Sequence, residues 1–284
     1  MLGAGGQVGR AVIRTLDGRH EIIAKARSEL DIADAAAVAR VMAVAEPDWV
    51  VNAAAYTAVD LAEDEPTRAA AINDAAVGIL ADAAARIQSR LLHLSTDFVF
   101  DGSLNRAYRP SDVPHPLSVY GATKLAGERR ALESGAAAIV LRTAWVYAAA
   151  GKNFVLTMLK LMRERDQVRV VSDQIGAPTW ATGLGAVIRD LLEAQAPAGT
   201  YHWTDLGVAS WYDFAVAIQD EALVRGLLPR AVPIVPIATK EYPTRATRPV
   251  FSVLDTQAAR AAVATPALHW RHNLRMMLDE LRAA

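Results

Sequence analysis

The first half of the chain alternates short apolar runs with longer stretches of helical periodicity, and this alternation restricts the fold more than any other feature. The apolar runs cover residues 21–24, 49–52, 90–94 and 137–141, and the helical stretches lie near 7–16, 33–45, 66–87 and 116–133. Asp34 is the expected N-cap of the second helix. A strand–helix series buries both faces of a parallel sheet under helices. The sequence therefore predicts an α/β fold with a doubly wound parallel, Rossmann-type sheet.

The pattern loosens after Tyr147. Helices are expected near 153–165, 181–194, 210–223 and 268–281, with a strand near 167–171 and a turn-rich segment at 173–179. We expect residues 1–147 to form a Rossmann domain that binds NADP. Residues 148–284 then form mainly a smaller substrate lobe, partly interleaved with the first domain because a segment near 181–195 returns to it.

The glycine loop at the start of the chain has almost no strand before it, since the sequence opens Met1-Leu2-Gly3. In a doubly wound fold that strand lies in the middle of the sheet. We therefore expect the first strand to be truncated here, with the true N-terminus upstream of Met1.

Composition excludes several classes of function. The chain has 284 residues, 52% of them hydrophobic, and a formal net charge of −1, which gives no support to binding of nucleic acid or an anionic membrane. It has no cysteine, so disulfides, thiol nucleophiles and thiolate metal sites are excluded. We find neither a membrane-spanning apolar run nor a secretory signal, and expect a cytoplasmic protein without a membrane partner.

Gly3, Gly6 and Gly9 have G-x-x-G-x-x-G spacing at the start of the first helical stretch. Without a Cβ, such a loop lets backbone N–H groups approach a pyrophosphate at the positive end of the helix. The same glycines are compatible with a plain turn that binds nothing. The strand–helix series that follows favours the dinucleotide site.

Two further segments bear on the cofactor. Lys25 and Arg27 follow the second apolar run, where basic side chains accommodate the 2′-phosphate of NADP, unless they are ordinary surface charges. They favour NADPH, with NADH a possible cofactor. Ala53, Ala54 and Ala55 follow the third predicted strand of the fold, where small residues let a flat cofactor lie against the backbone, although tight packing would require them equally.

Tyr120 and Lys124 are four residues apart on a predicted helix, so their side chains share one face. A nearby ammonium group lowers the pKa of a phenol, which can then give a proton to the alkoxide formed when hydride reaches a ketone. Ser95, Thr96 and Asp97 follow a strand at the edge where this fold binds ligands. The hydroxyls of Ser95 and Thr96 either bind the substrate oxygen or form hydrogen bonds with the loop backbone. With the glycine loop, the order of these motifs predicts a reductase.

Taken together, these residues resemble the extended short-chain dehydrogenase/reductase family and, more narrowly, its dTDP-4-dehydrorhamnose reductases. The matching segments are 3–9 (GAGGQVG), 30–32 (LDI), 51–60 (VNAAAYTAVD), 94–102 (LSTDFVFDG), 120–124 (YGATK), 142–147 (RTAWVY), 173–179 (DQIGAPT), 210–214 (SWYDF) and 248–249 (RP). They span nearly the whole chain. The resemblance implies NADPH-dependent reduction of the 4-keto group of dTDP-4-dehydro-L-rhamnose to dTDP-L-rhamnose, in a cytoplasmic enzyme that is a possible homodimer.

The resemblance also implies roles for individual residues. The implied catalytic group is Thr96, Asp97, Tyr120 and Lys124. The implied cofactor contacts are Gly3, Gly6, Gln7, Val8, Gly9, Arg27, Asp31, Ile32, Ala53, Ala54, Ala55, Tyr120 and Lys124. The implied substrate contacts are Val59, Thr96, Asp97, Trp145 and Arg248. Trp145 is equally compatible with a core aromatic, and Arg248 either faces the substrate diphosphate or braces the lobe.

Two departures, the truncated first strand and Leu61, and two rival interpretations accompany this resemblance. Leu61 stands where relatives often have lysine. Some relatives bind Mg²⁺ at an acidic site, which makes Mg²⁺ a possible cofactor by resemblance alone, but no carboxylate cluster of this sequence can be assigned to a metal. Another nucleotide-sugar epimerase or reductase of the extended family is one alternative. A non-catalytic NADP-binding regulatory subunit is the other, and retention of Tyr120 and Lys124 favours an enzyme over it.

Overall fold

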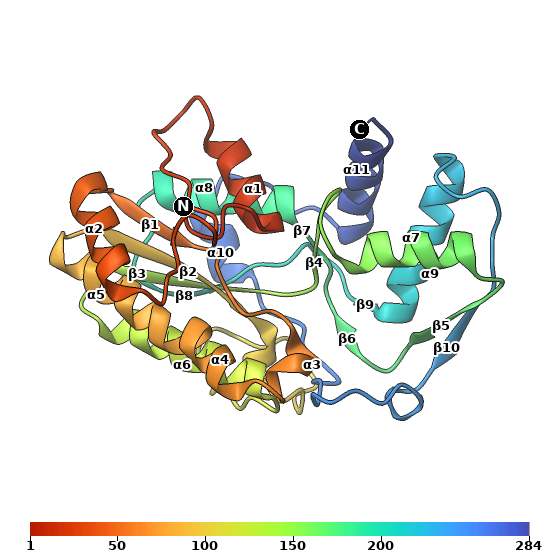
Figure 1. The fold of residues 1–284 in the computed structure, drawn as a ribbon. Coiled ribbons are helices and arrows are strands. Elements are labelled where there is room, and N and C mark those ends of the chain that lie inside the picture. Colours follow the sequence, from red (N-terminus) through yellow and green to blue (C-terminus); the bar gives the residue numbers. More distant parts are fainter. Residues whose placement is uncertain (284) are drawn as a thin grey trace.

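Four parallel strands form the central sheet of the larger lobe in the computed structural model, which describes residues 1–283. These strands are β1 (Trp49–Asn52), β2 (Arg90–Thr96), β3 (Ala138–Thr143) and β8 (Gly199–His202), in the order β1-β2-β3-β8. The register places Asn52 beside His93 and His93 beside Val140. The predicted parallel α/β fold is confirmed (Figure 1).

Beyond β1 the sheet is extended only by isolated β-bridges of single residues. Leu2 bridges Lys25 on one side and Asn52 on the other, and its N–H donates to the Val51 carbonyl at 2.8 Å. The strand expected at 21–24 is therefore wrong, because a strand needs a partner along its length and only Met1–Ala4 lies beside this segment. A cavity of about 310 Å³, lined by apolar side chains such as Ile23 and Leu80, lies in this region.

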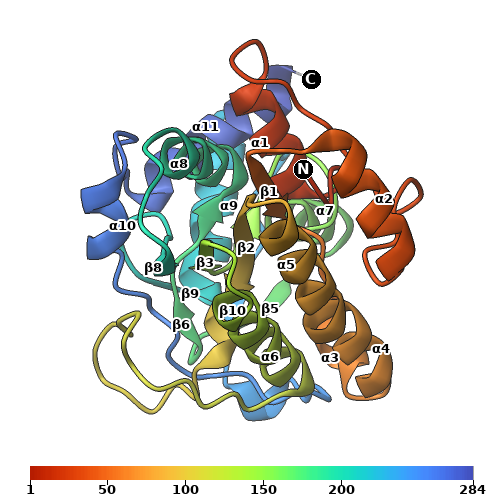
Figure 2. The ribbon, with the colours of Figure 1, turned by 90° about the vertical axis from the view of Figure 1, so that its left-hand side faces the viewer.

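Helices cover both faces of the sheet (Figure 2). One face packs against α2 (Ala35–Ala45), α5 (Ala76–Arg86) and α6 (Val119–Glu133), and the other against α1 (Gln7–Leu16), α8 (Ala181–Glu193) and α10 (Gln257–Ala262). Asp34 caps α2 as predicted, because its side chain accepts from the Ala37 N–H. The predicted helix 66–87 consists of α4 (Pro66–Ala70), a π-helical turn (Ala71–Ala75) and α5.

The helix α8 returns to the larger lobe and lies against α1. An added Cβ at Gly185 would lie 2.9 Å from the Ala11 carbonyl carbon, so the two helix backbones are in close contact. The Thr15 hydroxyl, at 3.2 Å from the Gly185 carbonyl oxygen, donates a hydrogen bond across the same contact. The chain after α8 then adds the edge strand β8, so the return is longer than residues 181–195.

The smaller lobe contains α7 (Phe154–Glu164), α9 (Trp211–Val224) and α11 (Trp270–Ala283), with the parallel pair β5 (Val168–Val171) and β10 (Ile234–Ile237). Its core includes Leu159, Met162, Phe214 and Leu274. Two-residue pairs, β4 (Val146–Tyr147) with β7 (Thr179–Trp180) and β6 (Ile175–Gly176) with β9 (Ala209–Ser210), lie near the junction of the lobes. Across residues 1–283, no helix has the length and apolarity needed to cross a membrane.

Candidate active site

The glycine loop and the turn after β1 are pressed together at the sheet edge. Gly3 has a φ of +74°, and a Cβ there would lie 2.6 Å from the Ala54 nitrogen. A Cβ on Gly9 would overlap the Gly3 carbonyl oxygen. Gly6 is the N-cap of α1 and has no side chain to bond the N–H groups of its first turn. These free N–H groups, on a backbone that approaches closely, fit a dinucleotide diphosphate.

Gln7 links this loop to the smaller lobe. Its Oε1 accepts from the Asn153 Nδ2 at 2.9 Å, and its Nε2 donates to the Lys152 carbonyl at 3.3 Å. Asn153 is the N-cap of α7 and accepts from the Leu156 N–H. The predicted cofactor residue Gln7 therefore also joins the first turn of α1 to the first turn of α7, whereas Val8 packs against the core of the sheet.

The predicted cofactor residues in the loop after Lys25 differ in their exposure to solvent. The side chain of Arg27 is exposed, and within residues 1–283 it has no carboxylate partner. The Asp31 carboxylate accepts from the Ala33 N–H at 3.0 Å, while Ile32 is buried in the core. The Arg27 side chain is therefore exposed and unpaired within residues 1–283, and Asp31 shapes the turn.

Thr96, Asp97 and Tyr120 are brought together where β2 ends and α6 begins. Thr96 donates to the Asp97 carboxylate at 3.0 Å and accepts from the Phe98 N–H at 3.2 Å. The Phe98 ring meets the Tyr120 ring edge-to-face, with centroids 5.6 Å apart. Ser118 starts α6 as its N-cap by accepting from the Gly121 N–H. The carboxyl end of β2 and the first turn of α6 thus carry three of the four predicted catalytic residues.

Burial changes the proton affinity of these groups. The pKa of Tyr120 is raised to about 12, mainly by burial and also by the charge of Asp97, against a hydrogen bond with Thr96 that lowers it. Burial also raises the pKa of Asp97 to about 6, against hydrogen bonds from Ser252 and Thr96 that lower it. Tyr120 is therefore a phenol at neutral pH and has a proton to donate.

Lys124 is buried, with 2% of its surface exposed, and burial lowers its pKa to about 8. Its Nζ donates to the Leu94 carbonyl at 2.6 Å and lies 3.2 Å from His93 Nε2. The expectation that Lys124 lowers the pKa of Tyr120 is wrong for this structure. The amine is directed at β2, and desolvation together with Asp97 dominates at the phenol.

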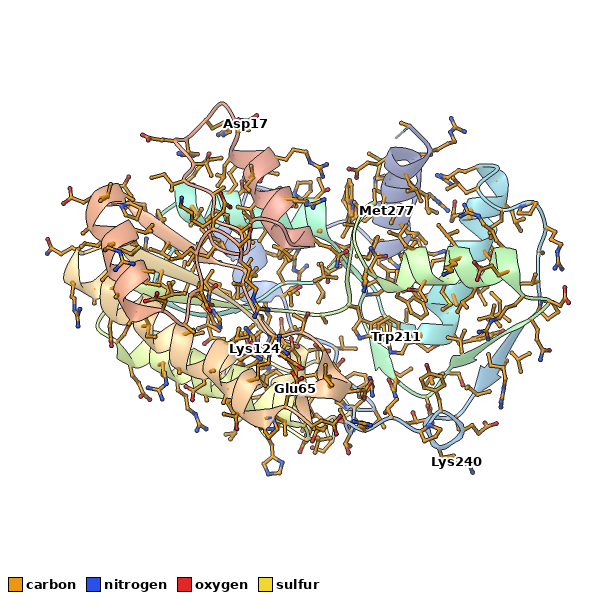
Figure 3. The ribbon with its side chains drawn as sticks, viewed as in Figure 1. Asp17, Glu65, Lys124, Trp211, Lys240 and Met277 are labelled. Carbon is orange, nitrogen blue, oxygen red and sulfur yellow. The ribbon has the colours of Figure 1, made fainter. Side chains whose placement is uncertain are left out.

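A small cavity of about 40 Å³ lies beside this group and is lined by Phe98, Trp145, Gln174, Trp211, Arg248, Pro249 and Ser252. Trp145 has a φ of +49° and stacks on Trp211, with ring centroids 3.5 Å apart and an interplanar angle of 7°. It therefore both lines the cavity and packs on the core of the smaller lobe. Figure 3 shows Lys124 in the larger lobe and Trp211 at the facing edge of the smaller one.

Arg248 is held by a carboxylate across the lobes. Its Nη1 and Nη2 bond the Asp60 carboxylate at 3.0 and 2.7 Å, on α3 (Val59–Ala62), and Asp60 also accepts from the Ala246 N–H. In this structure Arg248 braces the lobe while also lining the small cavity. Val59, a predicted substrate contact, starts the same short helix.

Sequence reasoning missed several residues of this region. Asp60, His93, Trp211 and Ser252 all contact predicted site residues or line the cavity. His93 carries a signal that could have been found, because it is a polar residue inside an apolar strand run. The others come near the site through contacts between distant parts of the chain. Among residues 1–283, no group of three His, Asp or Glu side chains is arranged to hold a metal.

Comparison with known proteins places the chain. The family model of the RmlD substrate binding domain matches residues 1–283. The chain belongs to this family. It is 41% identical to a dTDP-4-dehydrorhamnose reductase of Burkholderia thailandensis over 289 residues, which cover 98% of this chain and 97% of that protein. The resemblance seen in the sequence motifs is therefore confirmed.

Solved structures of the family have the same fold. A crystal structure of a dTDP-4-dehydrorhamnose reductase from Clostridium acetobutylicum has a TM-score of 0.94 at 35% identity, covering 99% of this chain and 98% of that one. The reductase from Bacillus anthracis in complex with NADP has a TM-score of 0.93 at 33% identity, covering 98% of this chain and 97% of that one. Both lobes of this chain are thus present in these relatives.

Proposed function

We propose that this chain uses NADPH to reduce the 4-keto group of dTDP-4-dehydro-L-rhamnose to dTDP-L-rhamnose. Its membership of a family that contains named dTDP-4-dehydrorhamnose reductases makes it an NAD(P)H-dependent oxidoreductase. The observation that carries the proposal is the convergence of the glycine loop, Thr96, Asp97, Tyr120 and Lys124 at one edge of the sheet. The NADP complex of the Bacillus anthracis relative supports the choice of cofactor.

Each part of the site has a role in this reaction. The nicotinamide cofactor supplies the hydride when it is bound. Gly3, Gly6 and Gly9 accommodate its diphosphate, and the exposed Arg27 meets the 2′-phosphate. Thr96 and Tyr120 bind the substrate carbonyl oxygen. Tyr120, protonated at neutral pH, donates the proton that the nascent alkoxide takes up.

The smaller lobe supplies the sugar and diphosphate contacts in this proposal. Trp145, held in a stack on Trp211, lines the small cavity. Arg248 lines the same cavity, and its guanidinium matches a diphosphate once it leaves Asp60. The cavity is too small for a nucleotide sugar in this arrangement, so the proposal requires the lobes to separate slightly when substrate binds.

The decisive experiment follows NADPH oxidation with dTDP-4-dehydro-L-rhamnose and identifies the product. We expect stoichiometric NADP formation and dTDP-L-rhamnose. Consumption of the ketose with retained cofactor would instead indicate an epimerase. A chain that binds NADPH but oxidises none with any 4-keto nucleotide sugar would be a regulatory subunit.

The Tyr120→Phe substitution tests the proton donor. It removes one hydroxyl and keeps the ring that packs on Phe98. We expect kcat to fall by about 10²- to 10⁴-fold, the usual contribution of a positioned acid, while NADPH affinity stays near that of the parent chain. The measurements are steady-state turnover and fluorescence titration of NADPH. Near-normal turnover would remove Tyr120 from the mechanism.

A further inference from the structure

His93 lies in the middle of β2 with none of its surface exposed. Both ring nitrogens meet polar groups on neighbouring elements. Nδ1 lies 3.1 Å from the Asn52 amide nitrogen on β1, and Nε2 lies 3.2 Å from the Lys124 amine on α6. The imidazole therefore connects the end of β1 to Lys124, one of the predicted catalytic residues.

The orientation of Asn52 determines the tautomer of His93. Its Oδ1 accepts from the Ala54 N–H at 3.0 Å, so the side-chain NH₂ is the group that faces Nδ1. An amide NH₂ only donates hydrogen bonds, and Nδ1 must therefore accept without carrying a hydrogen. Burial and the charge of Lys124 lower the pKa of His93 well below its ordinary value, so the ring is neutral. Its single hydrogen is on Nε2.

The Nε2–H group then faces the Lys124 amine. An ammonium group has only hydrogens to offer, so two donors would oppose each other at 3.2 Å. An uncharged amine accepts from Nε2–H with its lone pair and still donates to the Leu94 carbonyl. The series of hydrogen bonds from the Asn52 amide through His93 to the Lys124 amine consequently favours the uncharged form of Lys124.

Other charged groups around Lys124 do not reverse this preference. Glu128, one turn further along α6, favours the ammonium form, but its carboxylate is bonded on both oxygens by Arg142 from β3. The charge of Asp97 acts on the Tyr120 phenol, and Asp97 is not among the groups that shift the pKa of Lys124. His93 is the side chain in hydrogen-bond contact with the amine itself.

We propose that His93, oriented by Asn52, is a positioning residue that holds the Lys124 amine in place and makes it lose its charge at a lower pH than a free lysine before ligands bind. Only the kinetic consequence of this assignment rests on the proposed function. When Tyr120 gives up its proton, a charged Lys124 stabilises the phenolate that remains. The Asn52–His93 pair therefore sets the pH above which that stabilisation is lost.

The Asn52→Asp substitution should reverse the tautomer. A carboxylate only accepts, so it can bond the Ala54 N–H and a hydrogen on His93 Nδ1 together. Nε2 then becomes the acceptor and favours the ammonium form of Lys124. We expect the basic limb of the kcat/KM profile to move up by about one pH unit, the size that a direct hydrogen-bond change gives.

The first measurement is ¹⁵N NMR of histidine-labelled protein without cofactor, which reports the tautomer independently of activity. The chain has 6 histidines, and the His93 signal is assigned by its absence in His93→Gln or, if that variant does not fold, by its shift in Lys124→Met. We expect hydrogen on Nε2 in the parent chain and on Nδ1 in Asn52→Asp. Hydrogen on Nδ1, or on both nitrogens, in the parent chain would overturn the assignment.

The second measurement separates the hydrogen-bond effect from the added charge. Asn52→Asp is compared in the parent and in the His93→Gln background by pH profiles of kcat/KM and of NADPH affinity. We expect the larger shift where His93 is present, and equal shifts in both backgrounds would refute its role. If no chain turns over, the proposed function fails, and the NMR result and the pH dependence of NADPH binding still decide the role of His93.

Discussion

The buried ion pair behind the active site gives the most quantitative test of the fold. Glu128 on α6 and Arg142 on β3 form two parallel hydrogen bonds of 2.9 and 2.6 Å, with side chains only 2% and 4% exposed. The guanidinium also faces His202 Nε2 at 3.3 Å and lies 5.1 Å from the centre of the Phe100 ring. The pair joins the helix that carries Tyr120 and Lys124 to the sheet.

Removing one partner should destabilise the chain far more than removing both. In Glu128→Met the guanidinium stays buried without its carboxylate, which costs about 3–5 kcal/mol for a broken buried pair. The double variant Glu128→Met with Arg142→Met leaves no unpaired charge and should recover most of that loss, because two apolar side chains of similar length fill the space. At about 2 °C per kcal/mol for a large domain, the single variant should melt roughly 6–10 °C lower.

The assay is urea unfolding followed by circular dichroism, supported by thermal melting. Asp166→Asn is the matched control, because it breaks an ion pair with Arg230 in which the carboxylate side chain is 98% exposed, and we expect no measurable change. A Glu128→Met variant as stable as this control would show that the Arg142 guanidinium does not remain buried as an unpaired charge. A double variant as unstable as the single one would show that packing, and not charge, dominates.

Three further predictions follow from single contacts. Burial raises the pKa of Asp205 to about 7, against about 3.9 for an ordinary aspartate, so the folded state binds the extra proton and stability should fall as pH rises from about 4 to 7. Asp97 contributes with the same sign, and Asp205→Asn should flatten the fall in urea midpoints measured across that range. Gly176→Ala should raise the KM for the nucleotide sugar without weakening NADPH binding, because its Cβ would lie 2.7 Å from the Trp145 ring; Gly183→Ala, with no atom nearer than 3.9 Å, is its control. Arg27→Asp should weaken NADPH far more than NADH in fluorescence titrations, and an equal effect on both would contradict the 2′-phosphate assignment.

Periodicity predicted most of the elements because each buries its own apolar face. The strand at 49–52 was predicted to the residue, and α2 begins after Asp34 as expected. The run at 21–24 has the same local pattern but forms no strand, since a ladder depends on a partner elsewhere in the chain. Strand formation at residues 21–24 thus depends on the pairing of two segments, and the local sequence of one segment does not determine it.

The site could be predicted as a set of motifs but not as a set of contacts. Gly3 lies against Ala54, which follows from both segments ending at the same edge of a parallel sheet. The pairing of Arg248 with Asp60 joins residues 188 positions apart, and nothing in either segment specifies it. The sequence left the role of Arg248 open for this reason, and the structure shows it as a brace bonded to Asp60.

The charge of Lys124 shows why motif spacing is insufficient for mechanism. Four-residue spacing puts Tyr120 and Lys124 on one helical face, and this spacing alone predicts a lowered phenol pKa. The structure instead directs the amine to the Leu94 carbonyl and His93 on β2, and buries both groups. Since desolvation raises the pKa of a phenol and lowers that of an amine, Tyr120 starts as an uncharged phenol, and Lys124, with a pKa of about 8, loses its charge more readily than a free lysine. Any activation of Tyr120 by Lys124 must therefore accompany the binding of cofactor and substrate, which is when the pair needs it.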